Sequence, residues 1–176
     1  MVAKDQKYFL VNRITERAKS GLNFLYEVLT TIHTGGTDAA FSRSCYILFS
    51  YNFELILKSW IILNRNETVK MDLLRGLSSH DLEKLSKEIP ENKLVDIDIE
   101  SIKKKEDNGF IEYAVKMVDD REIVVQDLVD VRYDFVKDNL RGTDRNEGNR
   151  MREEVDLLLR IVKKIIEKST TAKRLI

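Results

Sequence analysis

The sequence predicts a mainly α domain with a β-hairpin inserted near residues 110–126. Two observations predict the helices: apolar residues recur every three or four positions over residues 7–33, and residues 38–64 are apolar on almost every face. A third predicts the hairpin, because apolar and polar residues alternate over residues 111–117 before an acidic break and a β-branched run. A chain of 176 residues can bury a sizeable core without disulfides or metal.

The first predicted helix covers residues 7–33 and carries its apolar residues in one stripe. These residues are Leu10, Ile14, Ala18, Leu22, Leu25, Leu29 and Ile32. Gly35 and Gly36 can adopt the left-handed backbone that ends a helix. Thr37 or Asp38 can then cap the next helix. The first two helices are therefore expected to form an antiparallel pair.

The second predicted helix, residues 38–64, is so apolar that we expect it at the centre of the fold, or half covered by a partner subunit. Its most apolar window is about long enough to span a bilayer, but Asn52, Glu54 and Lys58 interrupt it. We interpret it as a buried helix of a soluble protein. Glu54 precedes Lys58 by four residues, the order that favours an ion pair along one helix face.

The middle of the chain predicts a short helix and then the hairpin. Serines at 78 and 79 followed by acidic residues mark a helix start, and Pro90 bounds the segment. The lysine run 103–105 lies beside two acidic residues and is interpreted as a solvated turn. A helix is also compatible with the run after residue 110, but its alternation favours the hairpin.

A further helix is predicted after the hairpin, starting at Asp127 and ending near Gly142. Residues 141–150 contain two glycines and no large apolar residue until the last helix begins, which predicts a surface loop. Because such loops often carry function, Arg141 and Arg145 are candidate binding residues.

The last predicted helix covers residues 150–168, where apolar residues are spaced for docking against other helices. Residues 169–176 are expected to fray. The chain shows no repeat or linker, so we expect a single domain over residues 1–176.

Composition excludes several classes of function. Thirty basic residues balance thirty acidic ones, so binding to nucleic acid or an anionic membrane would have to be local. Two histidines and one cysteine are too few for a structural zinc site, and no glycine-rich phosphate loop occurs. We therefore expect no metal and no cofactor. The single cysteine and the charged first residues suggest a cytoplasmic protein.

One pair of residues could carry chemistry, because Arg75 and His80 lie close together in the sequence. In metal-independent RNA cleavage, His80 would move the proton of a 2′-hydroxyl and Arg75 would stabilise the phosphate charge. In the structural interpretation, His80 is a first-turn residue whose ring nitrogens bond to backbone or to a neighbouring acid, and Arg75 is a solvated loop cation.

Arg132 and Tyr133 form a second candidate pair in the helix after the hairpin. A structural role would bury the tyrosine ring and pack the arginine stem. A functional role would bring Arg132 to His80 or to a bound phosphate. The lysines at 103–105 lack interleaved aromatic residues and are weak evidence for RNA binding.

Three short motifs occur in a distinctive order: residues 49–58 with Glu54 and Lys58 one turn apart, the segment His80-Asp81-Leu82, and the pair Arg132-Tyr133. This series, over roughly residues 7–140, resembles the HEPN helical domains. The resemblance implies a helical bundle that forms a homodimer.

HEPN relatives divide into metal-independent endoribonucleases of toxin–antitoxin and antiviral defence systems, and accessory or binding modules that often act beside a nucleotidyltransferase. The endoribonucleases use an arginine and, a few residues later, a histidine, a spacing that Arg75 and His80 match. Gly76, however, stands where a polar residue usually follows the arginine. The pair also lies between early helices rather than late in the bundle, and the hairpin departs from the minimal domain.

The resemblance therefore implies a non-catalytic module that acts on RNA or with a nucleotidyltransferase partner. An endoribonuclease that uses Arg75 and His80 is one alternative. An assembly protein with no nucleic-acid role is another.

Overall fold

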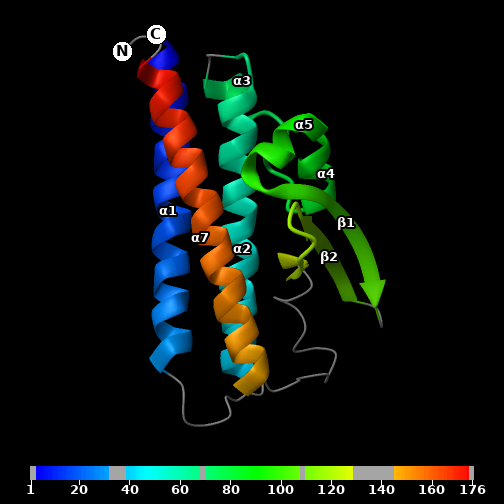
Figure 1. Cartoon of the computed structure of the whole chain (residues 1–176). Helices are drawn as coiled ribbons and strands as arrows, with labels where there is room; N and C mark the ends of the chain where they lie inside the picture. The colour runs from blue at the N-terminus through cyan, green and yellow to red at the C-terminus, as the bar shows by residue number, and fades with distance from the viewer. Residues whose placement is uncertain (1–2, 32–38, 68–69, 108–109, 129–144, 175–176) are drawn as a thin grey trace.

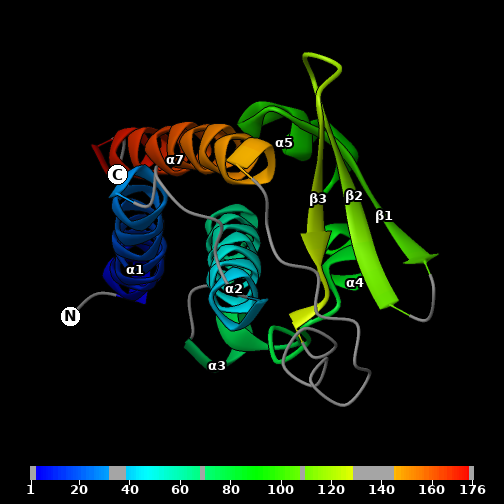
Figure 2. The same cartoon turned by 90° about the horizontal axis from the view of Figure 1, so that it is seen from below.

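The computed structural model describes residues 3–31, 39–67, 70–107, 110–128 and 145–174. Its main body is a bundle of three long helices. They are α1 (Ala3–Thr31), α2 (Ala39–Asn64) and α7 (Arg145–Arg174). Figure 1 shows α1 running antiparallel to both α2 and α7. Seen from below, a small sheet and the short helices α4 (Leu82–Lys87) and α5 (Glu91–Leu94) lie on the opposite side of α2 from α1 (Figure 2). The structure is mainly α, as predicted.

The antiparallel pair of long helices agrees with the sequence to within a few residues. The helix predicted over 7–33 spans Ala3–Thr31, and the helix predicted over 38–64 spans Ala39–Asn64. Of the predicted α1 stripe, Ala18, Leu22 and Leu25 are buried, whereas Leu10, Ile14 and Leu29 are partly buried. Val11, which the stripe did not include, is also buried. The two helices approach closely at Gly21, where an added Cβ would lie 2.4 Å from Oδ1 of Asn52.

The central helix is α2, which contacts α1 and α7 as well as α4 and β3. Its large side chains are buried, among them Phe49, Phe53 and Trp60. Ser44 is the only exposed residue from 43 to 64, and a half-buried stripe runs along Ile47, Tyr51 and Leu55. The central location predicted for this helix is thus confirmed within one chain.

Burial also accounts for the apolar composition of α2. The span Arg43–Asn64 is long and apolar enough to cross a membrane, with a mean hydropathy of 1.3, but 61% of it is buried in the fold. This agrees with its interpretation as a core helix.

Four short helices follow α2. They are α3 (Lys70–Leu74), α4 (Leu82–Lys87), α5 (Glu91–Leu94) and the single 3-10 turn η1 (Val95–Ile97). The predicted short helix before Pro90 is α4, but it does not begin at a serine. Asp81 caps it, since Oδ1 accepts a hydrogen bond from the Lys84 amide at 2.9 Å. Ser79 supports the cap, because its Oγ accepts a hydrogen bond from the Asp81 amide.

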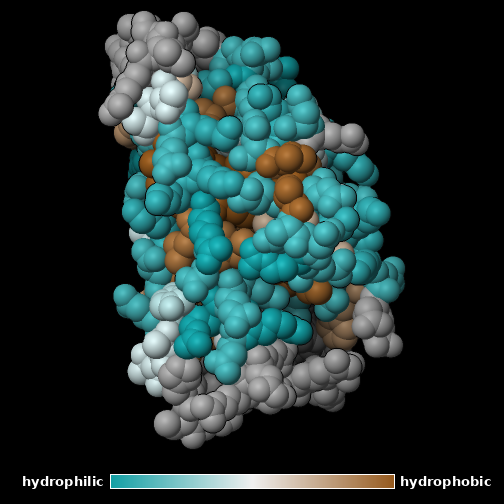
Figure 3. Space-filling view, in the orientation of Figure 1, coloured by the Kyte–Doolittle hydropathy of each residue, from teal (hydrophilic) through white to brown (hydrophobic). Residues whose placement is uncertain are grey.

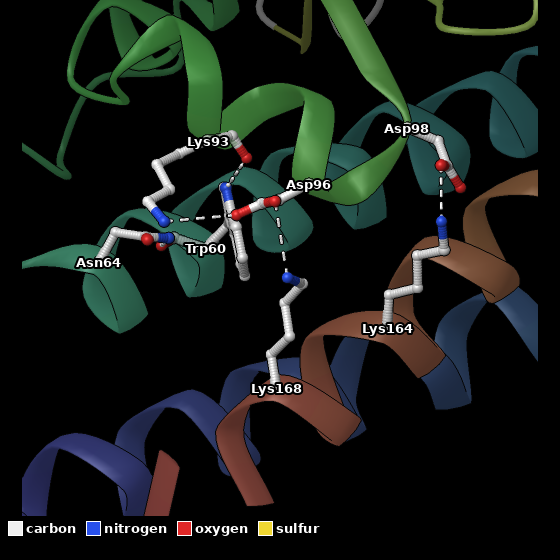
Figure 4. Close-up of polar contacts among 7 residues, drawn as sticks. All are labelled: Trp60, Asn64, Lys93, Asp96, Asp98, Lys164 and Lys168. Atoms are coloured by element: carbon white, nitrogen blue, oxygen red, sulfur yellow. Dashed lines mark hydrogen bonds and ion pairs between the residues drawn. The ribbon is translucent and has the colours of Figure 1, made fainter. Parts of the chain in front are cut away.

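A cluster of polar contacts attaches α5 and η1 to the bundle (Figure 4). Trp60 of α2 donates a hydrogen bond from Nε1 to the backbone oxygen of Lys93 at 2.9 Å. Asp96 lies between Lys93 and Lys168, with N···O distances of 3.5 and 3.6 Å. Because Lys168 belongs to α7, the cluster joins the middle of the chain to its last helix.

The sheet is antiparallel, with strand order β1-β2-β3. Its strands are β1 (Ile99–Asp107), β2 (Phe110–Met117) and β3 (Glu122–Gln126). The predicted hairpin is confirmed as β2 and β3, with Tyr113 opposite Val125. Asp120 in its turn has a φ of 65°.

The lysine run 103–105 lies in β1, so its interpretation as a turn is wrong. Lys104 pairs in register with Tyr113 of β2. These lysines are exposed on both faces of an edge strand, so the sequence there lacks the alternation of apolar and polar residues that predicts a strand. Lysines on an edge strand discourage pairing with the edge of another chain.

The last helix is longer than predicted at both ends. Residues 145–149, predicted as loop, are helical, and the helix continues to Arg174 through most of the tail that was expected to fray. The tail is ordered by packing against α1: Ser169 is buried, and its Oγ lies 3.3 Å from Oδ1 of Asn12. The helix predicted from Asp127 to Gly142 lies almost entirely outside the described residues.

The face shown in Figure 3 is mostly hydrophilic, with hydrophobic residues in several separate patches. The apolar side chains of the three long helices are instead gathered largely in the buried core.

Candidate functional site

A buried glutamate on α2 joins two of the three motifs that carry the HEPN resemblance. The Glu54 side chain is 3% exposed. Its Oε1 accepts a hydrogen bond from Lys58 Nζ at 2.7 Å, and its Oε2 lies 2.8 Å from His80 Nδ1. The predicted ion pair between Glu54 and Lys58 is therefore confirmed. The contact with His80, 26 residues further along the chain, was not predicted.

Electrostatics explain why the buried Glu54 carboxylate needs both Lys58 and His80. A carboxylate removed from water is costly unless opposite charge and hydrogen bonds compensate it. Lys58 supplies the charge from one helical turn away, and its side chain is only 14% exposed. His80 supplies the second hydrogen bond from the segment before α4. This three-residue cluster, Glu54, Lys58 and His80, is called the Glu54 cluster below.

The Glu54 cluster also determines how the imidazole is presented. An ionised carboxylate can only accept hydrogen bonds, so the contact with Glu54 favours a form of His80 with a hydrogen on Nδ1. Nε2 is then the nitrogen available to accept a proton. The His80 side chain is 45% exposed. A carboxylate that orients an imidazole in this way is the arrangement used by general bases in catalysis.

The structure agrees in part with the structural interpretation of His80, since one ring nitrogen bonds to an acid, but that acid is Glu54 of α2. It places the residue differently within the chain. His80 precedes Asp81, the N-cap of α4, rather than lying in the first turn of that helix.

The Arg75 side chain does not belong to the Glu54 cluster. Its side chain is 81% exposed, and Nη2 donates a hydrogen bond to Asp72 Oδ1 at 2.7 Å. Within the described ranges it forms no hydrogen bond or ion pair with His80 or Glu54. The two residues predicted as a catalytic pair thus have separate acidic partners.

Arg65 is a half-buried residue that orders the backbone before α4, and sequence reasoning missed it. Its Nη1 donates hydrogen bonds to three backbone oxygens, those of Asp72, Leu73 and Arg75, at 3.1, 2.9 and 2.8 Å. Its Nη2 pairs with Glu88 at 3.2 Å. Arg65 therefore fixes the backbone that carries Arg75. A single arginine in a polar break gives no signal of this role.

A buried tyrosine on β2 is hydrogen-bonded to the residue that follows β3. Tyr113 lies on β2 without solvent exposure, and its hydroxyl donates a hydrogen bond to Asp127 Oδ2 at 2.9 Å. Burial, followed by the bond to Asp127, raises the pKa of Tyr113 far above its ordinary value. Asp127 directly precedes Leu128, which is helical, as expected of the predicted cap position, and its carboxylate also holds the end of β3 against β2.

The remaining predicted binding residues are only partly placed. Arg132, Tyr133 and Arg141 lie outside the described residues. Arg145 begins α7, so it belongs to a helix rather than to the predicted loop.

The basic run on β1 is largely compensated by acids. Lys104 lies 4.0 Å from Asp81 Oδ2, and Lys105 pairs with Glu122 at 3.0 Å. In the part of the chain that the structure describes, no group of three or more His, Cys, Asp or Glu side chains could hold a metal ion.

Comparisons with family models, with curated proteins and with solved structures find no significant match to this chain.

Proposed function

We propose that the chain is a HEPN-like, non-catalytic binding module of a cytoplasmic defence or toxin–antitoxin system, acting on RNA or with a nucleotidyltransferase partner. The observation that supports a non-catalytic role is that Arg75 and His80 have separate acidic partners. Arg75 is bonded to Asp72 on the surface, whereas His80 is bonded to the buried Glu54.

That separation matters because metal-independent cleavage needs both groups at one phosphate. The histidine must reach the 2′-hydroxyl while a cation stabilises the charge that develops on the phosphate. Lys58 is the cation nearest to His80 in the Glu54 cluster, but its Nζ is bonded to Glu54. The cluster is therefore better suited to joining α2 to α4 than to stabilising a transition state.

Charge favours a protein partner over RNA. The chain has no net charge, and the lysines of β1 at 104 and 105 already have acidic partners. Nucleic-acid affinity depends on cations that replace the counterions of the phosphates. A nucleotidyltransferase or another protein is thus the preferred partner.

One observation favours the endoribonuclease as a second candidate. Glu54 holds Nδ1 of His80, which leaves Nε2 for proton transfer. In that function His80 would be the general acid and base, and Glu54 would be a positioning residue. Arg75 would have to exchange Asp72 for the phosphate of the substrate.

A cleavage assay decides between the two. Purified protein is incubated with single-stranded RNA in the presence of a chelator, alongside His80→Ala and Arg75→Ala. We expect no cleavage by any of the three. Cleavage by the wild type that both substitutions abolish would overturn the non-catalytic proposal. Cleavage that survives both would eliminate this pair as the site.

A binding assay separates the module from an assembly protein. RNA binding is measured as salt is raised, because phosphate contacts are strongest at low ionic strength. A nucleotidyltransferase encoded beside the gene for this chain is tested for complex formation by co-purification. Failure of both would favour the assembly protein.

A further inference from the structure

Strand β1 is the outermost strand of the sheet, and its outer edge is uncovered in the part of the chain that the structure describes. There it pairs with β2 alone, because the strand order is β1-β2-β3. Figures 1 and 2 both show β1 on the side of the sheet that faces away from the long helices. All residues from 103 to 106 are exposed. Another extended segment can pair with a strand edge of this kind.

The hydrogen bonds around the hairpin show which backbone groups face this outer edge. The Met117 amide donates to the Arg121 oxygen at 2.8 Å, and the Asp127 amide donates to the Ile111 oxygen at 2.9 Å. Odd-numbered residues of β2 therefore bond to β3, and even-numbered residues bond to β1. The β1 residues opposite these even-numbered residues are Ser101, Lys103, Lys105 and Asp107. The backbone groups of the residues between them point outward.

Three residues of β1 thus offer their backbone N–H and C=O groups to a partner: Ile102, Lys104 and Glu106. Among the described residues, none of the three makes a backbone hydrogen bond to a further element. They span about 14 Å of strand and are called the β1 edge below. A peptide strand both donates and accepts hydrogen bonds, whereas the phosphate oxygens of RNA can only accept them.

Lysines flank the β1 edge on both faces of the sheet. Lys103 and Lys105 lie on one face, and Lys104 lies on the other. Lys104 is 4.0 Å from Asp81 and Lys105 is 3.0 Å from Glu122, but both pairs are exposed, so other carboxylates can replace these partners at little cost. Lys103 forms no ion pair within the described ranges. A strand with three consecutive acidic residues would place one carboxylate opposite each lysine.

A second copy of β1 is a poor occupant of this edge. If two copies paired antiparallel about Lys104, each Lys103 would face a Lys105, and the two Lys104 side chains would face each other. Like charges directly opposite one another on a sheet are destabilising. The lysines therefore disfavour pairing between copies and favour an acidic strand from another protein.

We propose that the β1 edge binds an extended acidic segment of a partner protein, which adds to the sheet as an antiparallel fourth strand. Backbone hydrogen bonds supply the affinity of such complexes, and side-chain pairs supply their specificity. From its N-terminus, the segment has a basic residue opposite Glu106 and then three acidic residues opposite the lysines. The proposal does not depend on the proposed function, because the edge would take such a segment in a binding module, an endoribonuclease or an assembly protein.

Fluorescence anisotropy with the full chain and a labelled peptide tests the proposal. The peptide is Thr-Val-Lys-Glu-Glu-Glu-Val-Thr, and its control has three lysines in place of the three glutamates. At low ionic strength the acidic peptide should bind, and the control should bind at least about ten-fold more weakly. Circular dichroism checks that every variant of the protein is folded.

Changes to the backbone separate strand pairing from charge attraction. Lys104→Pro removes an outward N–H but leaves the ladder with β2 intact, and Lys104→Thr is its matched control. Binding should be at least about ten-fold weaker in Lys104→Pro than in Lys104→Thr, because the edge loses a donor and its close approach. N-methylation of the peptide glutamate opposite Lys104 should have the same effect. N-methylation of the glutamate opposite Lys103 should be tolerated, since that amide points away from the edge.

Charge exchange tests the register. Lys103→Glu should weaken binding of the acidic peptide about ten-fold, and a lysine in place of the facing glutamate, the last of the three, should restore it. Lys19→Glu is the matched control, because Lys19 is an exposed lysine of α1, away from the sheet. It should change binding by less than about two-fold.

Three results would overturn the proposal. The first is no binding of the acidic peptide at low ionic strength. The second is binding that Lys104→Pro and N-methylation leave unchanged, which would show charge attraction without strand pairing. The third is tighter binding of single-stranded RNA, or a dimer in sedimentation, that Lys104→Pro abolishes, which would assign the edge to that occupant.

Discussion

Replacing Gly21 by alanine should destabilise the protein, although alanine is the better helix former. An ideal Cβ at this position would lie 2.4 Å from Oδ1, 2.6 Å from Nδ2 and 2.8 Å from Cγ of Asn52. The Asn52 amide is 1% exposed and donates a hydrogen bond to the Leu48 oxygen at 2.7 Å. The new methyl group therefore forces a buried, hydrogen-bonded side chain to move.

The size of the effect follows from three contributions. Alanine gains about 0.5–1 kcal/mol over glycine in a helix interior. Overpacking a core costs about 1–3 kcal/mol, and losing the hydrogen bond of a buried amide costs about 1–3 kcal/mol. The costs overlap because the same movement of Asn52 produces both. We expect the free energy of unfolding to fall by about 1–3 kcal/mol. The Tm should fall by about 2–4 °C for each kcal/mol lost.

Chemical denaturation monitored by circular dichroism measures this loss. Gly148→Ala is the matched control, because Gly148 lies inside α7 and an added Cβ meets no atom within 4 Å. It should stabilise the protein by up to about 1 kcal/mol. Adding Asn52→Ala to Gly21→Ala should recover part of the lost stability. If Gly21→Ala is as stabilising as Gly148→Ala, the close approach of α1 and α2 is refuted.

Three further predictions concern other parts of the fold. Lys58→Met leaves the buried Glu54 carboxylate without its lysine partner. It should lower the free energy of unfolding, measured by urea denaturation, by about 3 kcal/mol. A loss under about 1 kcal/mol would contradict the role of the ion pair. Burial raises the pKa of the Cys45 thiol to about 11, so the fold favours the neutral thiol. This contribution to stability is complete below the unfolded pKa of about 9 and is lost as the pH rises through 11. Alkylation by iodoacetamide at pH 9 should be much slower in the native protein than in urea, and equal rates would show an accessible thiol. Asp81→Ala removes the cap of α4 and should cost about 1 kcal/mol, whereas Asp81→Ser should retain most of it; equal losses in thermal melts would argue against the cap.

The sequence predicts best those elements whose signal is local. The apolar stripe of α1 and the all-round apolar face of α2 repeat with the helical period, so both helices were predicted to within a few residues. The ion pair between Glu54 and Lys58 was predicted for the same reason, since one helical turn separates them.

The elements that were missed depend on contacts between distant parts of the chain. Strand β1 exists because Ile102 and the lysines after it pair with β2, and their own composition does not indicate a strand. The helical tail after residue 168 is fixed by Ser169 against α1. His80 meets Glu54 only because α4 packs against α2.

The order in which the chain is made has a consequence for α2. Part of the apolar surface of α2 is covered by α7, whose residues 145–174 are synthesised after the whole sheet. A nascent chain on the ribosome therefore presents that surface until α7 emerges, and exposed apolar surface of this kind promotes aggregation. Chaperone dependence should be greatest during this interval, and chains truncated before α7 should be recovered as insoluble or chaperone-bound protein.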